Sequence, residues 1–269
     1  MNPAFDADSG RIRLDATAFE ALCRVADPAS RSAAALASDA APLAALHGSG
    51  ALVDGVAHEA LRPSLAAVQQ PIASLQLLVT GSAGYRLHQG WLSVVSAVLA
   101  DVGDGSYDFA AIGTEFVPTL VARMTRLGLR PHLGPASVAV TETVLAALAA
   151  HEAGPRAEAA QTLVSATAST WPAWSAAAQG GDWRFWVADV TWPAPADTAA
   201  SANTATSDDT ATSDDTGHRL AVLDTGAGLL RVDGDDSGPR LVAVTPTEVW
   251  HLLSSILPAD DEVAAAAPS

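Results

Sequence analysis

Two stretches of the chain, residues 12–22 and 138–148, have the same order of apolar and polar positions. In each, apolar residues first alternate along the chain, as in a half-buried strand, and then recur at helical spacing. Asp15 and Thr141 stand between the two patterns, where a side-chain oxygen can accept a hydrogen bond from the first turn of a helix. Each stretch therefore predicts a short strand that leads directly into a capped helix.

A second pair of stretches, residues 109–117 and 242–250, predicts a strand followed by a helix once more. Thr245, with proline next and Glu248 three positions on, is typical of a capping box that has proline in its first turn. Pro118 is compatible with a helix because it falls in the first turn, where an N–H group has no helical partner. The chain thus has two halves, each of which begins with a strand and a capped helix and ends with a strand and a helix.

The middle of each half is expected to hold one helical region followed by strands. Residues 58–70 carry apolar side chains on one helix face, and Pro71 ends that pattern; residues 156–178 are helical with a break at Pro172. The expected strands are residues 74–80, 90–98, 106–112, 183–192, 218–224, 228–232 and 240–244. An Asp-Gly pair within residues 101–105 favours a tight turn before the strand at 106–112.

These elements predict an α+β fold made of two halves, residues 1–135 and 136–258, packed as one globular unit. Helices flank hairpins in each half, so we expect a largely antiparallel β-sheet and a pseudo-two-fold arrangement. Matching order at both ends of the halves favours an internal duplication. The alternative is that alanine-rich helices resemble one another by composition alone.

Residues 194–217 differ in composition from the rest of the chain. The unit Ala-Thr-Ser-Asp-Asp-Thr occurs at 205–210 and again at 211–216. A polar, acidic repeat of this kind cannot bury apolar surface, so we expect a disordered insert between two strands. Residues 259–269 are expected to form a flexible tail.

The charge balance is strongly acidic, with 30 acidic against 14 basic residues and a net charge of -16. Phosphate backbones and anionic lipids repel such a chain, which argues against nucleic acid as a partner. The N-terminus lacks the basic and apolar regions of a secretion signal, and residues 159–181 are too polar to span a bilayer. With a single cysteine, Cys23, no intramolecular disulfide can form, and we expect a cytoplasmic protein without membrane insertion.

Asp224-Thr225-Gly226 is the most conspicuous chemical motif, because a hydrophobic residue followed by Asp-Thr-Gly is the signature of aspartic proteases. Those enzymes share a proton between two aspartates, and this chain has no second Asp-Thr-Gly. Too little chain follows Gly226 for the rest of a protease lobe. The turn of a β-hairpin is therefore the favoured interpretation, and an aspartate-dependent hydrolase is the alternative function.

Other candidate sites lack an essential part. Residues 233–238 hold several aspartates but not the glutamate at loop position twelve, nor the flanking helices, of a calcium site. His58 and His151 are each followed by glutamate but not by the second histidine of a zinc helix, and residues 81–84 are not followed by the Gly-Lys of a phosphate loop. We therefore expect no catalytic residue, no metal and no cofactor, and a role in binding.

Four stretches carry a resemblance to a known family: residues 50–61, 65–71, 220–229 and 242–250. With the helices and strands around them, they resemble the EspG family of type VII (ESX) secretion over most of the chain outside the acidic insert. The alanine-rich, lysine-free composition is typical of high-GC actinobacteria. The resemblance implies a cytosolic chaperone with a pseudo-two-fold fold that binds the helical tip of a PE-PPE-like substrate, keeps it soluble for export and needs no cofactor. The insert departs from the family and leaves the substrate open.

A chaperone requires an exposed apolar surface that its partner covers. Trp171 and Trp174, in the helical part of the second half, are the candidate partner-binding residues, and the alternative is that both belong to an ordinary core. Trp183, Trp186 and Trp192 are expected on the buried side of a strand. Besides the chaperone and the hydrolase, an interaction protein unrelated to secretion is a third hypothesis.

Overall fold

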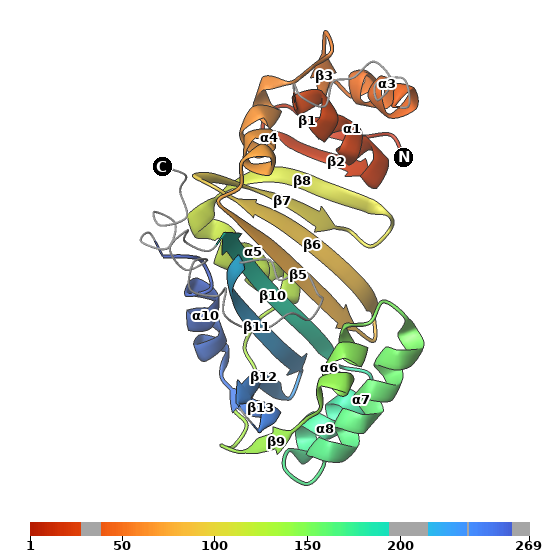
Figure 1. Cartoon of the computed structure of the whole chain (residues 1–269). Coiled ribbons are helices and arrows are strands. Elements are labelled where there is room, and N and C mark those ends of the chain that lie inside the picture. Colours follow the sequence, from red (N-terminus) through yellow and green to blue (C-terminus); the bar gives the residue numbers. More distant parts are fainter. Residues whose placement is uncertain (28–38, 194–214, 236, 260–269) are drawn as a thin grey trace, which may run out of the picture.

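One large antiparallel sheet dominates the computed structural model, which describes residues 1–27, 39–193, 215–235 and 237–259 (Figure 1). Its strands are β1 (Ala4–Asp6), β2 (Arg11–Asp15), β5 (Ala73–Gly81), β6 (Gly84–Leu92), β7 (Val95–Asp101), β8 (Ser106–Gly113), β9 (Ser137–Ala139), β10 (Arg184–Pro193), β11 (Asp215–Thr225), β12 (Gly228–Asp235) and β13 (Gly238–Val244). A separate small hairpin joins β3 (Leu52–Val53) to β4 (Val56–Ala57). All neighbouring strands of the large sheet are antiparallel, as predicted.

The strands follow the order β1-β2-β8-β7-β6-β5-β10-β11-β12-β13-β9 across the sheet. The pair β5 and β10 lies in the middle. Outward from it, each half contributes consecutive hairpin strands (β6, β7, β8 or β11, β12, β13) and then a short strand from the first part of that half (β2 or β9). On the first half's side, β1 adds one more strand at the edge. Apart from β1, the strand order is therefore the same on both sides of the central pair, whereas the pseudo-two-fold relation and the internal duplication stay predictions.

Helices cover both faces of the sheet, but in different places (Figure 1). They are α1 (Ala16–Ala26), α3 (Ala40–Gly48), α4 (Arg62–Gln69), α5 (Val117–Thr125), α6 (Glu142–Ala149), α7 (Ala153–Thr167), α8 (Pro172–Gln179) and α10 (Pro246–Ser254), with short 3-10 turns η2 (Glu59–Leu61) and η3 (Thr114–Phe116). Because strand side chains alternate between faces, α5 and α10 pack on the face that carries Leu77 and Trp186. The other face carries α1, α3 and α4 over Phe109 at one end, and α6, α7 and α8 over Phe185 at the other.

The predicted helix caps are confirmed. The carboxylate of Asp15 accepts a hydrogen bond from the amide of Ala18 at 2.9 Å, and the hydroxyl of Thr141 accepts one from Val144 at 3.3 Å. Thr245 and Glu248 form the complete capping box of α10. These contacts lie within one turn of chain, which is why local sequence was sufficient to predict them.

The strand predicted at residues 90–98 is wrong, because β6 ends at Leu92 and β7 begins at Val95. The sequence between them has no glycine or proline to indicate a turn, so the apolar run reads as one strand. Val94, at the turn, is 89% exposed. The turn is held instead by a long-range contact, since the hydroxyl of Thr114 donates to the carbonyl oxygen of Ser93 at 2.6 Å.

The predicted insert at 194–217 is bounded by β10 and β11, but β11 already begins at Asp215. Residues 194–214 of the insert, and residues 260–269 of the predicted tail, lie outside the described residues. In the part of the chain that is described, no helix has both the length and the apolar character needed to cross a membrane.

Candidate functional site

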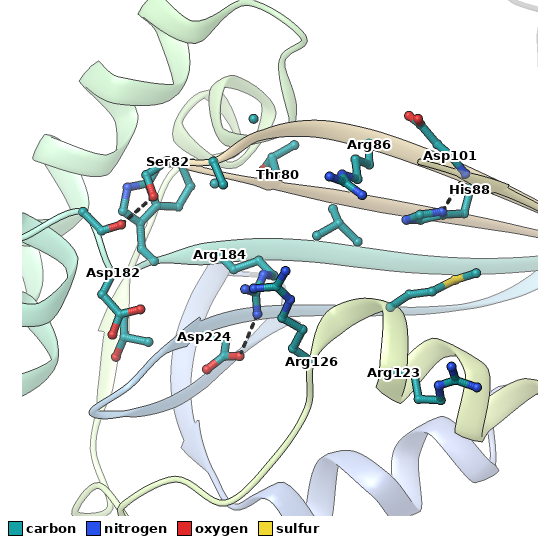
Figure 2. A pocket seen from close by; sticks show the side chains of 18 of the residues that line it. Thr80, Ser82, Arg86, His88, Asp101, Arg123, Arg126, Asp182, Arg184 and Asp224 are labelled. Atoms are coloured by element: carbon teal, nitrogen blue, oxygen red, sulfur yellow. Dashed lines mark hydrogen bonds and ion pairs between the residues drawn. The ribbon is translucent and has the colours of Figure 1, made fainter. Parts of the chain in front are cut away.

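A cavity of about 640 Å³ opens on the face of the sheet that carries α5 and α10 (Figure 2). Register places Val79 of β5 opposite Arg86 of β6, and Arg184 of β10 opposite Asp224 of β11, with all four side chains on this face. The C-terminal end of α5 and the loop after it complete the wall. The volume falls within the range of about 300–1,000 Å³ that is usual for ligand sites.

The end of α5 brings arginines to this cavity. Arg126, directly after the helix, has a left-handed backbone with φ of 56° and ψ of 36°. The reversal is closed by the amide of Leu127, which donates to the carbonyl oxygen of Ala122 at 2.8 Å. The chain then passes beside β11, so that Arg130 reaches Asp224, while Arg123 faces the cavity from the last turn of the helix.

Asp224 is the buried centre of the cavity wall, with a side chain that is 2% exposed. Arg130 binds it in a bidentate manner, from Nε to Oδ1 at 2.7 Å and from Nη2 to Oδ2 at 3.0 Å. Nη1 of Arg184 lies 3.6 Å from Oδ2 and donates to the carbonyl oxygen of Thr125 at 2.8 Å. The carboxylate of Asp224, on β11, thus binds Arg184 of β10 and Arg130 of the loop after α5, and Arg184 in turn binds the last residue of α5.

Burial and neighbouring charges shift the pKa values of Asp224, Arg130 and Arg184. Burial raises the pKa of Asp224, and the hydrogen bonds and charge of Arg130 counteract that rise. The hydrogen bond to Asp224 is the main reason that the pKa of Arg130 is raised. Burial lowers the pKa of Arg184; Asp224 opposes this shift, while the charges of Arg126 and Arg130 add to it. Arg184 therefore lies close to other positive charge as well as to its counter-ion.

The Asp-Thr-Gly motif forms a hairpin turn, as the favoured interpretation predicted. Thr225 and Gly228 pair at the end of β11 and β12. The amide of Gly226 donates to Oδ2 of Asp182 at 2.8 Å. Asp224 and Asp182 are thus hydrogen-bonded to protein donors, an arrangement unlike a pair of aspartates that share a proton.

The hydroxyl and imidazole groups at the cavity are also engaged. Ser82 and Thr80 donate to backbone carbonyl oxygens at 2.5 Å and 2.7 Å. Nδ1 of His88 accepts a hydrogen bond from the amide of Asp101 at 3.0 Å, and burial lowers the pKa of His88 to about 4, so its ring is neutral at pH 7. Among the cavity residues that the structure describes, no hydroxyl is hydrogen-bonded to a histidine or a carboxylate.

Three arginines that line the cavity are exposed: Arg86, Arg123 and Arg126. Their guanidinium groups have no ion pair or hydrogen bond with any residue in the described ranges. No sequence motif marks this cluster, because its members come from β6, α5 and the residue after α5. The one available signal was that every cationic side chain except histidine is an arginine.

Trp171 and Trp174 lie in the interior of the second half. They are 3% and 1% exposed and belong to the apolar cluster under α6, α7 and α8, with Leu163 and Phe185. Nε1 of Trp171 donates to the carbonyl oxygen of Gly134 at 3.3 Å. In this structure both are core residues, so an apolar contact surface has to come from other side chains.

Exposed apolar side chains do gather at the turn between β6 and β7. Val94, Val95 and Phe116 are 89%, 39% and 58% exposed. Val95 pairs with Gly113 at the end of β8, and the hydrogen bond from Thr114 to Ser93 holds the turn against the segment that carries Phe116. We call these three residues the turn patch.

The remaining candidates for chemistry are few. Within the described residues there is no group of three or more histidine, cysteine, aspartate or glutamate side chains arranged to hold a metal ion. Cys23 is partly buried in α1, and burial raises its pKa to about 12, so the thiol is protonated.

Comparison with known proteins gives a match in structure but not in sequence. No protein-family model and no curated protein matches the chain. The chain is similar in structure to EspG5, the Mycobacterium tuberculosis type VII secretion system chaperone, solved in complex with a PE25-PPE41 dimer. The TM-score is 0.56 and the identity 12%, over 92% of this chain and 97% of that one. Since the match extends over nearly all of both chains, this protein has a fold similar to that of EspG, with a large antiparallel sheet flanked by helices.

Proposed function

We propose that this protein is a cytoplasmic chaperone of a type VII secretion system, which binds a PE-PPE-like substrate and keeps it soluble for export. The observation that carries the proposal is the similarity to EspG5, a chaperone of such a system, across 92% of this chain. Partial similarity would indicate only a shared substructure. Coverage of the whole fold supports a shared role as well.

The turn patch supplies the kind of surface that this role requires. A chaperone of helical proteins must cover apolar side chains that would otherwise aggregate in water. Val94 and Phe116 are large, apolar and mostly exposed, at a turn fixed by hydrogen bonds. A fixed surface loses little conformational entropy when it binds, which favours affinity.

Co-expression with a PE-PPE-like pair from the same genome tests the proposal. We expect the three proteins to elute together in size-exclusion chromatography, and the pair to be more soluble than when expressed without the chaperone. Separate elution with no gain in solubility would refute the role.

Variants of the turn patch locate the contact. Val94→Asp combined with Phe116→Asp should abolish co-elution without unfolding the protein, because both side chains are exposed. Leu129→Asp is the matched control, since Leu129 is 96% exposed and lies outside the patch. Loss of co-elution in the control but not in the double variant would exclude the turn patch.

The proposal also holds that the protein acts without catalysis. It is supported by the carboxylate of Asp224, both of whose oxygens are hydrogen-bonded to Arg130. Incubation of the purified protein with a peptide library between acidic and neutral pH should give no cleavage. Cleavage that disappears in Asp224→Asn would establish the hydrolase instead.

A further inference from the structure

Positive charge is concentrated in one place on an acidic protein. The chain has 14 basic residues and a net charge of -16. Five of those residues line the cavity beside α5: Arg86, Arg123, Arg126, Arg130 and Arg184. The molecule as a whole repels anions, but a local concentration of positive charge can attract an anionic ligand.

Four aspartates line the same cavity and compensate only part of this charge. Asp224 is paired with Arg130 and Arg184, and Asp108 with Arg11, which lies outside the lining. Asp101 accepts hydrogen bonds from backbone amides, and Asp182 accepts one from the amide of Gly226. Arg86, Arg123 and Arg126 remain without a counter-ion in the described part of the chain.

The backbone at Arg126 supports a functional reason for an arginine at this position. A residue with positive φ directly after a helix is usually glycine, because a side chain costs about 1 kcal/mol in this conformation. The chain keeps arginine there, and Figure 2 shows its side chain directed toward Arg184. The charge of Arg126 contributes to the lowered pKa of Arg184, so the two guanidinium groups repel each other and a bound anion would relieve that repulsion.

The distribution of the arginines indicates the class of ligand. They come from β6, α5, the loop after it and β10, and apolar side chains such as Val79, Met124 and Val102 lie among them in the lining. One small anion cannot meet groups on so many elements, whereas several carboxylates spaced along a peptide can. The apolar side chains between them suit the apolar residues of the same peptide.

We propose that this cavity binds an acidic segment of a protein partner, whose carboxylates pair with Arg86, Arg123 and Arg126 and whose apolar side chains contact Val79 and Met124. Arginine is well suited to this role, because its planar guanidinium binds a carboxylate through two parallel hydrogen bonds. The proposal does not depend on the role in secretion.

Fluorescence polarisation with a labelled peptide tests the proposal on the full chain. The probe is a short peptide in which glutamate alternates with leucine, and the reference peptide has glutamine in place of glutamate. We expect the glutamate peptide to bind, the glutamine peptide not to bind, and the affinity to fall as salt increases. Equal affinity for the two peptides would overturn the proposal.

Variants identify the residues. Arg86→Gln combined with Arg126→Asn should weaken binding about tenfold or more, and asparagine is used because it tolerates positive φ. Arg123→Gln changes one exposed side chain of α5 and should weaken binding by a smaller factor. Arg62→Gln, at an exposed arginine of α4 outside the cavity, is the matched control and should bind like the wild type. Unchanged affinity in the double variant, with normal thermal unfolding, would contradict the proposed site.

Competition separates the peptide from a small anion. Inorganic phosphate should displace the peptide no better than chloride at equal ionic strength, because the site requires several separated anions. Complete displacement by phosphate at low concentration would show a small-anion site and would refute the peptide proposal. The co-elution test of the secretion role uses a different partner and a different surface, so the two proposals can fail separately.

Discussion

The C-terminal ends of α5 and α10 lie on the same face of the sheet, at opposite ends of β10, and differ in chemistry. At the end of α5, Arg184 donates to the carbonyl oxygen of Thr125 beside the charged cavity. At the end of α10, the rings of Trp192 and His218 meet edge to face with centroids 4.9 Å apart. Nδ1 of His218 lies 3.2 Å from the carbonyl oxygen of Ile256. The end of α5 thus borders a cavity lined by charged side chains, whereas aromatic rings pack beside the end of α10.

Two helix ends on one face of the same sheet thus differ in how they are stabilised. Aromatic packing at the end of α10 gains stability from contact and apolar burial. The end of α5 instead buries a carboxylate and depends on its arginines to offset the cost of desolvation. Stability at the end of α5 should therefore respond to charge and pH much more than stability at the end of α10.

Removal of the carboxylate of Asp224 should have the largest effect. Asp224→Ala leaves Arg130 and Arg184 without their shared counter-charge, and breaking a buried pair costs about 3–5 kcal/mol. We expect the lower part of that range, because Arg130 is partly exposed. Urea unfolding measures the change in the free energy of unfolding. Asp182→Ala, which removes one exposed hydrogen bond, should cost about 1 kcal/mol or less, and equal costs for the two variants would contradict the central role of Asp224.

Acid should destabilise the cavity through His88. Burial lowers its pKa from an ordinary 6.5 to about 4, so between those values the unfolded chain binds more protons than the folded one. Stability therefore falls as pH falls, by about 2 kcal/mol between pH 7 and pH 5. Protonation also removes the hydrogen bond that Nδ1 accepts from Asp101. Unfolding measured across this range should show a weaker pH dependence in His88→Gln than in the wild type, and an unchanged pH dependence would contradict this role of His88.

At the start of α10, loss of the cap should have an intermediate effect. Thr245→Ala removes a capping box and should cost about 1 kcal/mol of the free energy of unfolding. Thr141→Ala removes a single cap hydrogen bond of 3.3 Å from α6 and should cost less. Thermal unfolding compares the two variants. A larger loss for Thr141→Ala would mean that the box adds nothing to α10.

The smallest change should be a gain in stability. Arg126→Gly removes the strain of positive φ after α5 and should stabilise the protein by about 0.5–1 kcal/mol, while weakening binding of the glutamate peptide. Ser255→Gly, after α10, is the matched control because Ser255 has φ of -96° and gains no relief. A loss of stability in Arg126→Gly would show that the arginine side chain supports the fold rather than a ligand.

Much of the fold was predictable, for a local reason. The caps at Asp15, Thr141 and Thr245, and the helix break at Pro172, depend on neighbours within a turn of chain. The turn after Leu92 was not predictable, because its hydrogen bond comes from Thr114, on the other side of a hairpin.

The candidate site was largely hidden in the sequence. Asp224 stood out as part of a protease-like motif, yet its partners Arg130 and Arg184 are distant in sequence and carry no motif of their own. Trp171 and Trp174, in contrast, were conspicuous in the sequence as candidate partner-binding residues but lie in the core. Their helical spacing is the same for an exposed stripe and for a buried one, and only packing against neighbouring elements distinguishes the two.

The sequence by itself determined most of the helices and strands of this protein, the antiparallel character of its sheet and the acidic character of the whole, because propensity, capping and net charge depend on composition and near neighbours. It did not indicate α3. Tertiary structure alone decided where charge is buried and where it remains free. Strand register and the reversal after α5 bring Asp224 to Arg130 and leave Arg86, Arg123 and Arg126 without a partner in the described chain. Electrostatic interactions depend on separation in space, and that separation is set only when the sheet is assembled.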